Sequence, residues 1–176
     1  GFSDGPTSPR SFTNVAKDMR AMLKSANIPA PYVLVGHSLG NAHIRAFAHL
    51  YPDEVAGVVF IDPINARVFE VATEAEKAED EKWGKEFEKT APEGAKAEMR
   101  FMASDSNFSM LRSFTKLPDV PVVLLVAGRH EAGPVWTRSV VEEYGPFVYA
   151  SPEGSMVVDP ESGHYVHRDN PDLAIS

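Results

Sequence analysis

PYVLVGHSLGNAHIRAFAHLYP, residues 31–52, joins a short apolar run to a helical pattern through the motif Gly-His-Ser-Leu-Gly. Residues 32–35 are apolar without polar alternation, which is typical of a parallel strand that is covered on both faces. After Ser38 the apolar residues recur at helical spacing, and Pro52 ends the pattern. The sequence therefore predicts a strand that turns directly into a helix, with Ser38 at the bend.

A bend of this kind has two consequences for the serine. It imposes an unusual backbone angle on Ser38 and brings the strand close to the helix, which requires glycine at Gly36 and Gly40. It also holds the serine at the carboxyl end of the strand, beside the free N–H groups of the helix N-terminus. Gly-x-Ser-x-Gly in this context is typical of a nucleophilic serine. The simpler interpretation is a Gly-Ser turn without a catalytic role.

A nucleophilic serine needs a histidine as its base. His164 is the preferred base because it follows a predicted strand, residues 155–158, and a Ser-Gly pair, which places it at the same edge as Ser38. His37 is too constrained to turn back on the serine, and we expect it to contact substrate. His167 is a weaker candidate at the surface or at a helix start. His130 follows another predicted strand and remains open.

Two carboxylates compete for the role of the acid that orients the histidine. Asp62 directly ends a predicted strand, residues 55–62, and is followed by Pro63, so it would hold an imidazole rigidly. Glu131 follows the predicted strand over residues 122–127, but it is longer and precedes Ala-Gly-Pro. The non-catalytic interpretations are a capping carboxylate for Asp62 and an exposed loop charge for Glu131. The residues favour Asp62 slightly and leave both open.

The order of these patterns predicts one domain with an insert. A core part over residues 1–63 carries Ser38, a helical cap spans residues 64–118, and a second core part over residues 119–176 carries His164. The charged first half of the insert and its Met- and Phe-rich second half favour a lid above an apolar substrate. Met102 and Phe108 are the candidate pocket residues. Alternatively, such residues only pack the cap onto the sheet.

Composition excludes several classes of protein. A chain of 176 residues with 43% hydrophobic content can bury one substantial core. A net charge of −8 argues against nucleic acid and anionic membranes as partners, and no apolar run reaches transmembrane length. There is no cysteine for a thiolate metal site and no glycine-rich phosphate loop, so no cofactor or metal is implied. The cellular compartment stays open.

The segments YVLVGHSLG, VAGVVFIDP, PVVLLVAGRHE and SGHYVHRDNPD together resemble the serine-esterase-like branch of the α/β-hydrolase fold superfamily. The resemblance covers essentially the whole chain. It implies an α/β fold with a parallel sheet, a helical cap insert and the catalytic order Ser, acid, His. The acid of the family usually follows the later strand, which favours Glu131, although some members use the earlier strand, which favours Asp62.

The resemblance also implies the chemistry. We expect a carboxylic ester hydrolase that acts on a small-molecule ester through an acyl-enzyme, with the backbone N–H of Leu39 as one oxyanion donor. The second donor and the first strands of the fold have no counterpart before residue 31. We therefore expect an open edge along residues 32–35 that pairs with a preceding segment or with another copy of the chain. The alternatives are lactone, thioester or amide hydrolysis, perhydrolysis, or a non-catalytic ligand-binding module.

Overall fold

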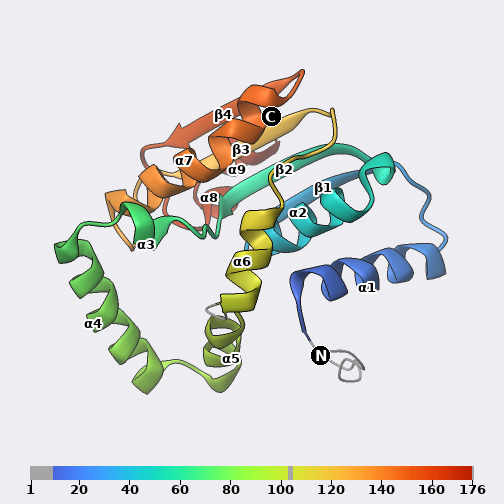
Figure 1. Ribbon diagram of the computed structural model, residues 1–176. Helices are drawn as coiled ribbons and strands as arrows, with labels where there is room; N and C mark the ends of the chain where they lie inside the picture. The colour runs from blue at the N-terminus through green and yellow to red at the C-terminus, as the bar shows by residue number, and fades with distance from the viewer. Residues whose placement is uncertain (1–9, 103–104, 176) are drawn as a thin grey trace.

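A computed structural model describes residues 10–102 and 105–175 (Figure 1). Its centre is a parallel sheet with the strand order β1-β2-β3-β4. The strands are β1 (Tyr32–Ser38), β2 (Val55–Pro63), β3 (Val122–Ala127) and β4 (Gly154–Asp159). Because all four run in the same direction, their carboxyl ends lie along one edge of the sheet. This arrangement confirms the predicted α/β class and the parallel sheet.

Helices precede, separate and follow the strands. They are α1 (Phe12–Ser25), α2 (Gly40–Leu50), the 3-10 turn η1 (Pro52–Glu54), α3 (Val68–Val71), α4 (Glu74–Thr90), α5 (Glu93–Met102), α6 (Asp105–Ser113), α7 (Pro134–Ala150), α8 (Val166–Asp169) and α9 (Pro171–Ile175). The start of α1 is fixed by a hydrogen bond from the Asn14 N–H to the Ser11 hydroxyl (3.2 Å).

The helix α7 has no counterpart among the predicted elements. Pro134 stands at its start and Pro146 lies inside it, and an internal proline normally indicates the end of a helix. Its apolar side is nevertheless buried, and the ring of Tyr144 packs edge-on against Phe60 of β2 with 4.9 Å between centroids. Tertiary packing therefore sustains a helix that the local sequence does not predict.

One face of the sheet carries the main hydrophobic core. In Figure 1, α1, α2 and α7 lie on the same side of the strands. Phe12 of α1, Phe47 of α2 and Leu124 of β3 are completely buried in this cluster. The core thus fixes α2, and with it the position of the residues at the end of β1.

The other face of the sheet is covered only in part. Ile61, Leu125 and Val166 form a smaller cluster, in which α8 and α9 cover β2 and β3. On β1, the side chains of Val33 and Val35 are 64% and 59% exposed. The prediction that both faces of residues 32–35 are covered is therefore wrong for the described residues, because alternate side chains of a strand point to opposite faces and no described helix reaches this one.

Strand β1 is also an edge of the sheet. Its register pairs it with β2 alone among the described residues. The expected open edge is thus present in this part of the chain. What pairs with that edge remains a prediction.

The described residues between β2 and β3 form four helices, α3 to α6. Figure 1 shows α4 projecting away from the sheet, while α6 runs back towards α2. None of the described side chains of α4 is buried, and Trp83 is 52% exposed. This part of the insert therefore packs less closely than the core does.

Both ends of the insert are bound by one buried ion pair. Arg45 of α2 donates to Glu143 of α7 (2.7 Å), and Arg45 Nε also donates to the carbonyl oxygen of Phe114 (3.0 Å). The other carboxylate oxygen of Glu143 accepts the backbone N–H of Ala66 (2.6 Å). Loss of either charged side chain would leave its partner buried and unpaired, which costs about 3–5 kcal/mol in proteins.

Candidate active site

Ser38 stands at a strained turn between β1 and α2. Its φ of 52° lies in the left-handed region, as the predicted bend requires. A Cβ on Gly36 would come within 2.9 Å of the backbone of Gly40 and Asn41, so glycine is necessary there. The expectation that close packing also requires glycine at position 40 is wrong, because a Cβ on Gly40 would meet no atom within 4 Å.

The amide of Asn41 ties this turn to the neighbouring strand. Its Nδ2 group donates to the carbonyl oxygens of Ser38 (3.1 Å) and Ile61 (2.9 Å), and its side chain is fully buried. The backbone N–H of Ile64 donates to the same Ser38 oxygen (3.3 Å). The ends of β1 and β2 are therefore held together. The sequence analysis did not identify Asn41, although a polar residue three positions after the serine on a buried helix face was a usable signal.

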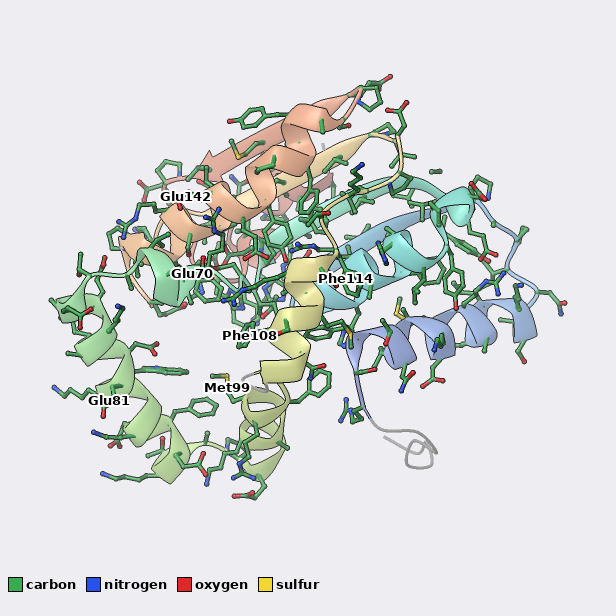
Figure 2. The ribbon with its side chains drawn as sticks, viewed as in Figure 1. Glu70, Glu81, Met99, Phe108, Phe114 and Glu142 are labelled. Carbon is green, nitrogen blue, oxygen red and sulfur yellow. The ribbon has the colours of Figure 1, made fainter. Side chains whose placement is uncertain are left out.

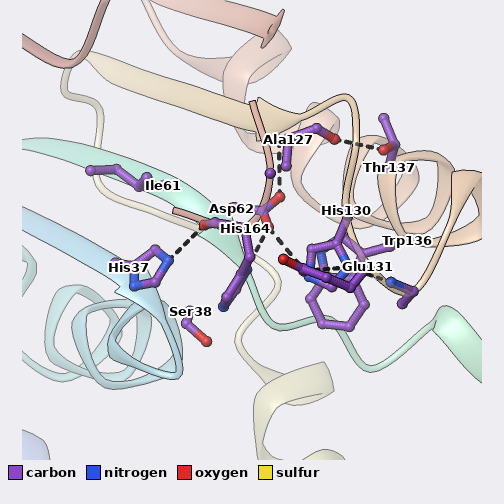
Figure 3. Close-up of polar contacts among 12 residues, drawn as sticks. His37, Ser38, Ile61, Asp62, Ala127, His130, Glu131, Trp136, Thr137 and His164 are labelled. Atoms are coloured by element: carbon purple, nitrogen blue, oxygen red, sulfur yellow. Dashed lines mark hydrogen bonds and ion pairs between the residues drawn. The ribbon is translucent and has the colours of Figure 1, made fainter. Parts of the chain in front are cut away.

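Asp62 lies at the end of β2 with a fully buried side chain and a φ of 36°. Its Oδ1 atom accepts the backbone N–H of Ala127 (3.0 Å). Its Oδ2 atom accepts a hydrogen bond of 2.6 Å from Nδ1 of His164. The carboxylate is thus oriented by β3 and hydrogen-bonded to the imidazole of His164 (Figure 3).

His164 lies in the loop between β4 and α8. The Nε2 atom of His37 donates to the His164 carbonyl oxygen (2.8 Å), and the two rings lie 4.6 Å apart. The Gly163 N–H before it donates to the side chain of Asp169 (2.9 Å). In Figure 3 the ring extends from Asp62 towards Ser38. The structure therefore brings Ser38, Asp62 and His164 to the same edge of the sheet.

The base of this loop is a polar network around Asp159. Its carboxylate accepts hydrogen bonds from the Ser162 hydroxyl (2.6 Å), the Asn170 amide (2.9 Å) and the Glu161 N–H (3.1 Å). These bonds lower the pKa of Asp159, that from Ser162 most strongly. The network fixes the chain on both sides of His164.

Glu131 lies in the loop after β3, where its Oε1 atom would be 3.6 Å from a Cβ on Gly163. Its side chain is 70% exposed, and its Oε2 atom lies 3.9 Å from Nδ1 of His130. No hydrogen bond between Glu131 and His164 occurs in the structure.

His130 is the side chain at this edge that the sequence left without a role. Its ring stacks on Trp136 with 4.3 Å between centroids, and its Nδ1 atom accepts the Ala132 N–H (3.0 Å). Its Nε2 atom lies 3.6 Å from Oδ2 of Asp62. Burial lowers the pKa of His130 to about 4, against a smaller opposing effect of the Asp62 charge. Only its place after a strand could have indicated it.

The remaining candidate residues have the following positions. The ring of His37, which we expected to contact substrate, is held by the backbone of His164. Leu39 immediately precedes α2 and is 9% exposed.

Phe108 lies on α6 and packs against the main core (Figure 2). The side chain of Met102 lies outside the described residues. His167 lies in α8, with its ring 4.7 Å from that of His37.

A model of the alpha/beta hydrolase fold family matches residues 1–139, well over half of the chain. The chain belongs to the alpha/beta hydrolase fold family. The matched segment contains Ser38 and Asp62, whereas His164 follows it. Within the part of the chain that the structure describes, no helix is both long and apolar enough to cross a membrane.

Solved structures of this fold family resemble the chain over almost all of its length. A predicted CIB-like hydrolase from Thermoplasma acidophilum is 18% identical with a TM-score of 0.57, covering 94% of this chain and 56% of its own. Est816, described as an N-acyl homoserine lactone degrading enzyme, is 17% identical with a TM-score of 0.59. The match covers 99% of this chain and 76% of Est816. A thermophilic esterase from Thermogutta terrifontis is 19% identical with a TM-score of 0.58, covering 99% and 72%. Identities this low establish the fold alone.

Curated relatives match shorter segments. An uncharacterized protein of Schizosaccharomyces pombe is 39% identical over 62 residues, which is 35% of this chain and 12% of the relative. A probable transporter of Hormonema carpetanum is 36% identical over 56 residues, 31% of this chain and 8% of the relative. The chain therefore spans only a small part of the length of these two relatives.

Proposed function

We propose that the protein is a serine-dependent carboxylic ester hydrolase with Ser38 as nucleophile, His164 as base and Asp62 as the orienting acid. The observation that carries this proposal is the 2.6 Å contact between His164 Nδ1 and Asp62 Oδ2, beside a serine at a strained strand-to-helix turn. Membership of the alpha/beta hydrolase fold family supports hydrolysis as the reaction class.

The proposed reaction follows from the positions of the protons. Asp62 keeps the imidazole proton on Nδ1, so Nε2 of His164 is free to accept the proton of the Ser38 hydroxyl as the oxygen attacks the ester carbonyl. His164 then donates this proton to the departing alcohol. Water, activated by the same imidazole, hydrolyses the acyl-enzyme and restores Ser38.

The negative charge of the intermediate needs hydrogen-bond donors. The backbone N–H of Leu39 directly follows the serine at the start of α2, where the positive end of the helix dipole favours an oxyanion. We assign one donor to Leu39. The insert over residues 64–118 serves in this proposal as a cap that shapes the acyl pocket, with Phe108 and Met102 as candidate pocket residues.

Cyclic esters are the second candidate substrates. The structural similarity to Est816, described as a lactone-degrading enzyme, favours including them. Lactone and open-chain ester hydrolysis use the same serine chemistry, so a panel of both substrates distinguishes them.

The decisive experiment tests activation of Ser38. A fluorophosphonate probe should label the protein on Ser38, and mass spectrometry of the digest should identify that peptide. Ser38→Ala should abolish both labelling and hydrolysis of p-nitrophenyl butyrate with an unchanged circular dichroism spectrum. Ser113→Ala, at an exposed serine, is the matched control and should leave both unchanged. Full turnover by Ser38→Ala would refute the nucleophile, and an unlabelled wild-type protein would favour a ligand-binding module.

A further inference from the structure

Asp62 faces two histidines rather than one. Each of Asp62, His130 and His164 offers one ligand atom, and these three atoms lie within 4.8 Å of one another. The set comes from three separate segments of the chain: the end of β2, the loop after β3 and the loop after β4. Two imidazoles and one carboxylate form a donor set that suits Zn²⁺.

We propose that Asp62 Oδ2, His164 Nδ1 and His130 Nε2 form a reversible Zn²⁺ site, and that occupation of this site switches the serine chemistry off. The binding part of this inference is independent of the reaction. The inhibitory part rests on the proposed function, because it requires His164 to be the base.

The distances fit such a site after a small movement. Zn²⁺ binds nitrogen and oxygen at about 2.0–2.1 Å, so two ligands of a tetrahedral ion lie about 3.4 Å apart. His130 Nε2 and Asp62 Oδ2 are already 3.6 Å apart. The 2.6 Å hydrogen bond between His164 and Asp62 must open by less than about 1 Å for the ion to enter between them. The ligand nitrogens of His130 and His164 lie within 4.8 Å of one another, so they must approach by at most about 1.4 Å. Rotation of the His164 side chain, which sits on a loop, can supply this movement.

Both imidazoles lie closer to the solvent than the carboxylate does. The side chains of His130 and His164 are 10% and 18% exposed, whereas the carboxylate of Asp62 is fully buried. Zn²⁺ would thus enter past the imidazoles and bind the aspartate from the solvent side. Water completes the coordination.

Inhibition follows from the imidazole tautomer. Without Zn²⁺, Nδ1 of His164 carries the proton and Nε2 is free to accept one from Ser38. When Nδ1 binds Zn²⁺, the proton of a neutral imidazole must sit on Nε2. His164 then presents a donor to Ser38 in place of an acceptor, and the serine cannot be deprotonated.

Glu131 gains a role in this arrangement. Binding through Nε2 of His130 requires a proton on its Nδ1 atom, so the hydrogen bond that Nδ1 accepts from the Ala132 N–H in this structure must break. The Oε2 atom of Glu131 lies 3.9 Å from that Nδ1 and is exposed, so it can turn to accept the new N–H. A carboxylate behind a ligating histidine is a common feature of zinc sites.

The test separates binding from activity. Zn²⁺ is titrated by calorimetry into tag-free Ser38→Ala, which cannot turn over ester. Co²⁺ replaces Zn²⁺ in a second titration, followed by visible absorption, which reports the coordination geometry. We expect one site per chain and a low-coordinate Co²⁺ spectrum. Absence of saturable binding in both titrations would overturn the proposal.

Matched variants locate the site. Ser38→Ala/His130→Phe keeps a flat ring against Trp136 but removes the third ligand, and its Zn²⁺ affinity should fall at least about tenfold. Ser38→Ala/His49→Phe removes an exposed histidine of α2 instead and should bind as Ser38→Ala does. Should the phenylalanine variant misfold, Ser38→Ala/His130→Gln replaces it. Equal affinities of the His130 and His49 variants would overturn the proposal.

The wild-type protein tests the link to catalysis. Zn²⁺ should suppress fluorophosphonate labelling and ester turnover over the concentration range in which it binds, and EDTA should restore both. Binding without any wild-type activity, even with EDTA, would refute the proposed function and leave the Zn²⁺ site standing. Binding without inhibition of an active enzyme would overturn the inhibitory part of this inference.

Discussion

The Nδ1 atom of His164 lies 2.6 Å from Oδ2 of Asp62, whereas Glu131 makes no hydrogen bond to His164 in the structure. The two carboxylates that the sequence left open are thus in different situations. Asp62 is buried and held by the Ala127 N–H, and Glu131 is 70% exposed.

The first prediction distinguishes these carboxylates. Asp62→Asn should lower turnover about 10⁴-fold, the effect known for the corresponding change in serine proteases, because an amide favours the wrong imidazole tautomer. Glu131→Gln should stay within about tenfold of wild type in metal-free buffer. Steady-state kinetics on p-nitrophenyl butyrate measure both. Small effects of similar size would remove both residues from the triad.

The second prediction concerns the cap. Phe108 is partly buried between α6 and the main core, so Phe108→Ala should open space beside the proposed acyl pocket and change the ratio of long-chain to short-chain ester turnover. Phe87→Ala on the projecting α4 is the control and should leave the ratio unchanged. A loss of thermal stability with a constant ratio would mean that Phe108 serves packing alone.

The third prediction concerns stability in acid. His43 of α2 packs edge-on against Phe12, and burial lowers its pKa to about 4, with a smaller contribution from Arg10. Because the folded pKa lies below the unfolded value of about 6.5, the unfolded state binds the proton more readily. The contribution of neutral His43 to the free energy of unfolding should therefore be fully present above about pH 6.5. It should be lost as the pH drops towards 4.

The variant His43→Phe tests whether His43 causes this loss of stability in acid. Urea unfolding at pH 7 and pH 5 should show a smaller loss of stability for the variant, by on the order of 1 kcal/mol. His130, whose pKa burial also lowers to about 4, keeps its own contribution in the variant. An identical loss in wild type and variant would exclude His43 as a cause.

The fourth prediction concerns β1. Within the described part of the chain, β1 is an edge strand with Val33 and Val35 exposed, so it offers both unpaired backbone groups and an apolar face. We expect the 176-residue chain, produced by itself, to associate with other copies or to aggregate. Val33→Lys/Val35→Lys should increase the monomer fraction in size-exclusion chromatography with light scattering. A monodisperse wild-type monomer with ordinary esterase turnover would contradict this prediction.

Local patterns were sufficient where a segment carries its own signal. Apolar runs indicated the strands, and β3 occupies the predicted residues, because a buried parallel strand is apolar throughout. The positive φ of Ser38 followed from the strand-to-helix motif in the same way. Whether each face of β1 is covered could not be inferred from the sequence. Val33 gives the same local pattern whether or not a helix packs above it.

Long-range contacts account for what the sequence missed. The pairing of His164 with Asp62 joins residues 102 positions apart, and local spacing does not distinguish Asp62 from Glu131. The place of His130 beside the same carboxylate depends on its stacking against Trp136. The helix α7 depends on burial of Tyr144, which outweighs the internal Pro146.

The ion pair of Arg45 and Glu143 has a consequence for how such a protein can diversify. It binds the backbone of Ala66, where the insert leaves the core, and that of Phe114, where it returns. Neither contact uses a side chain of the insert, although Leu111 between these two residues is buried in the main core. We therefore expect that the helices of the insert can change while Ser38, Asp62 and His164 keep their positions.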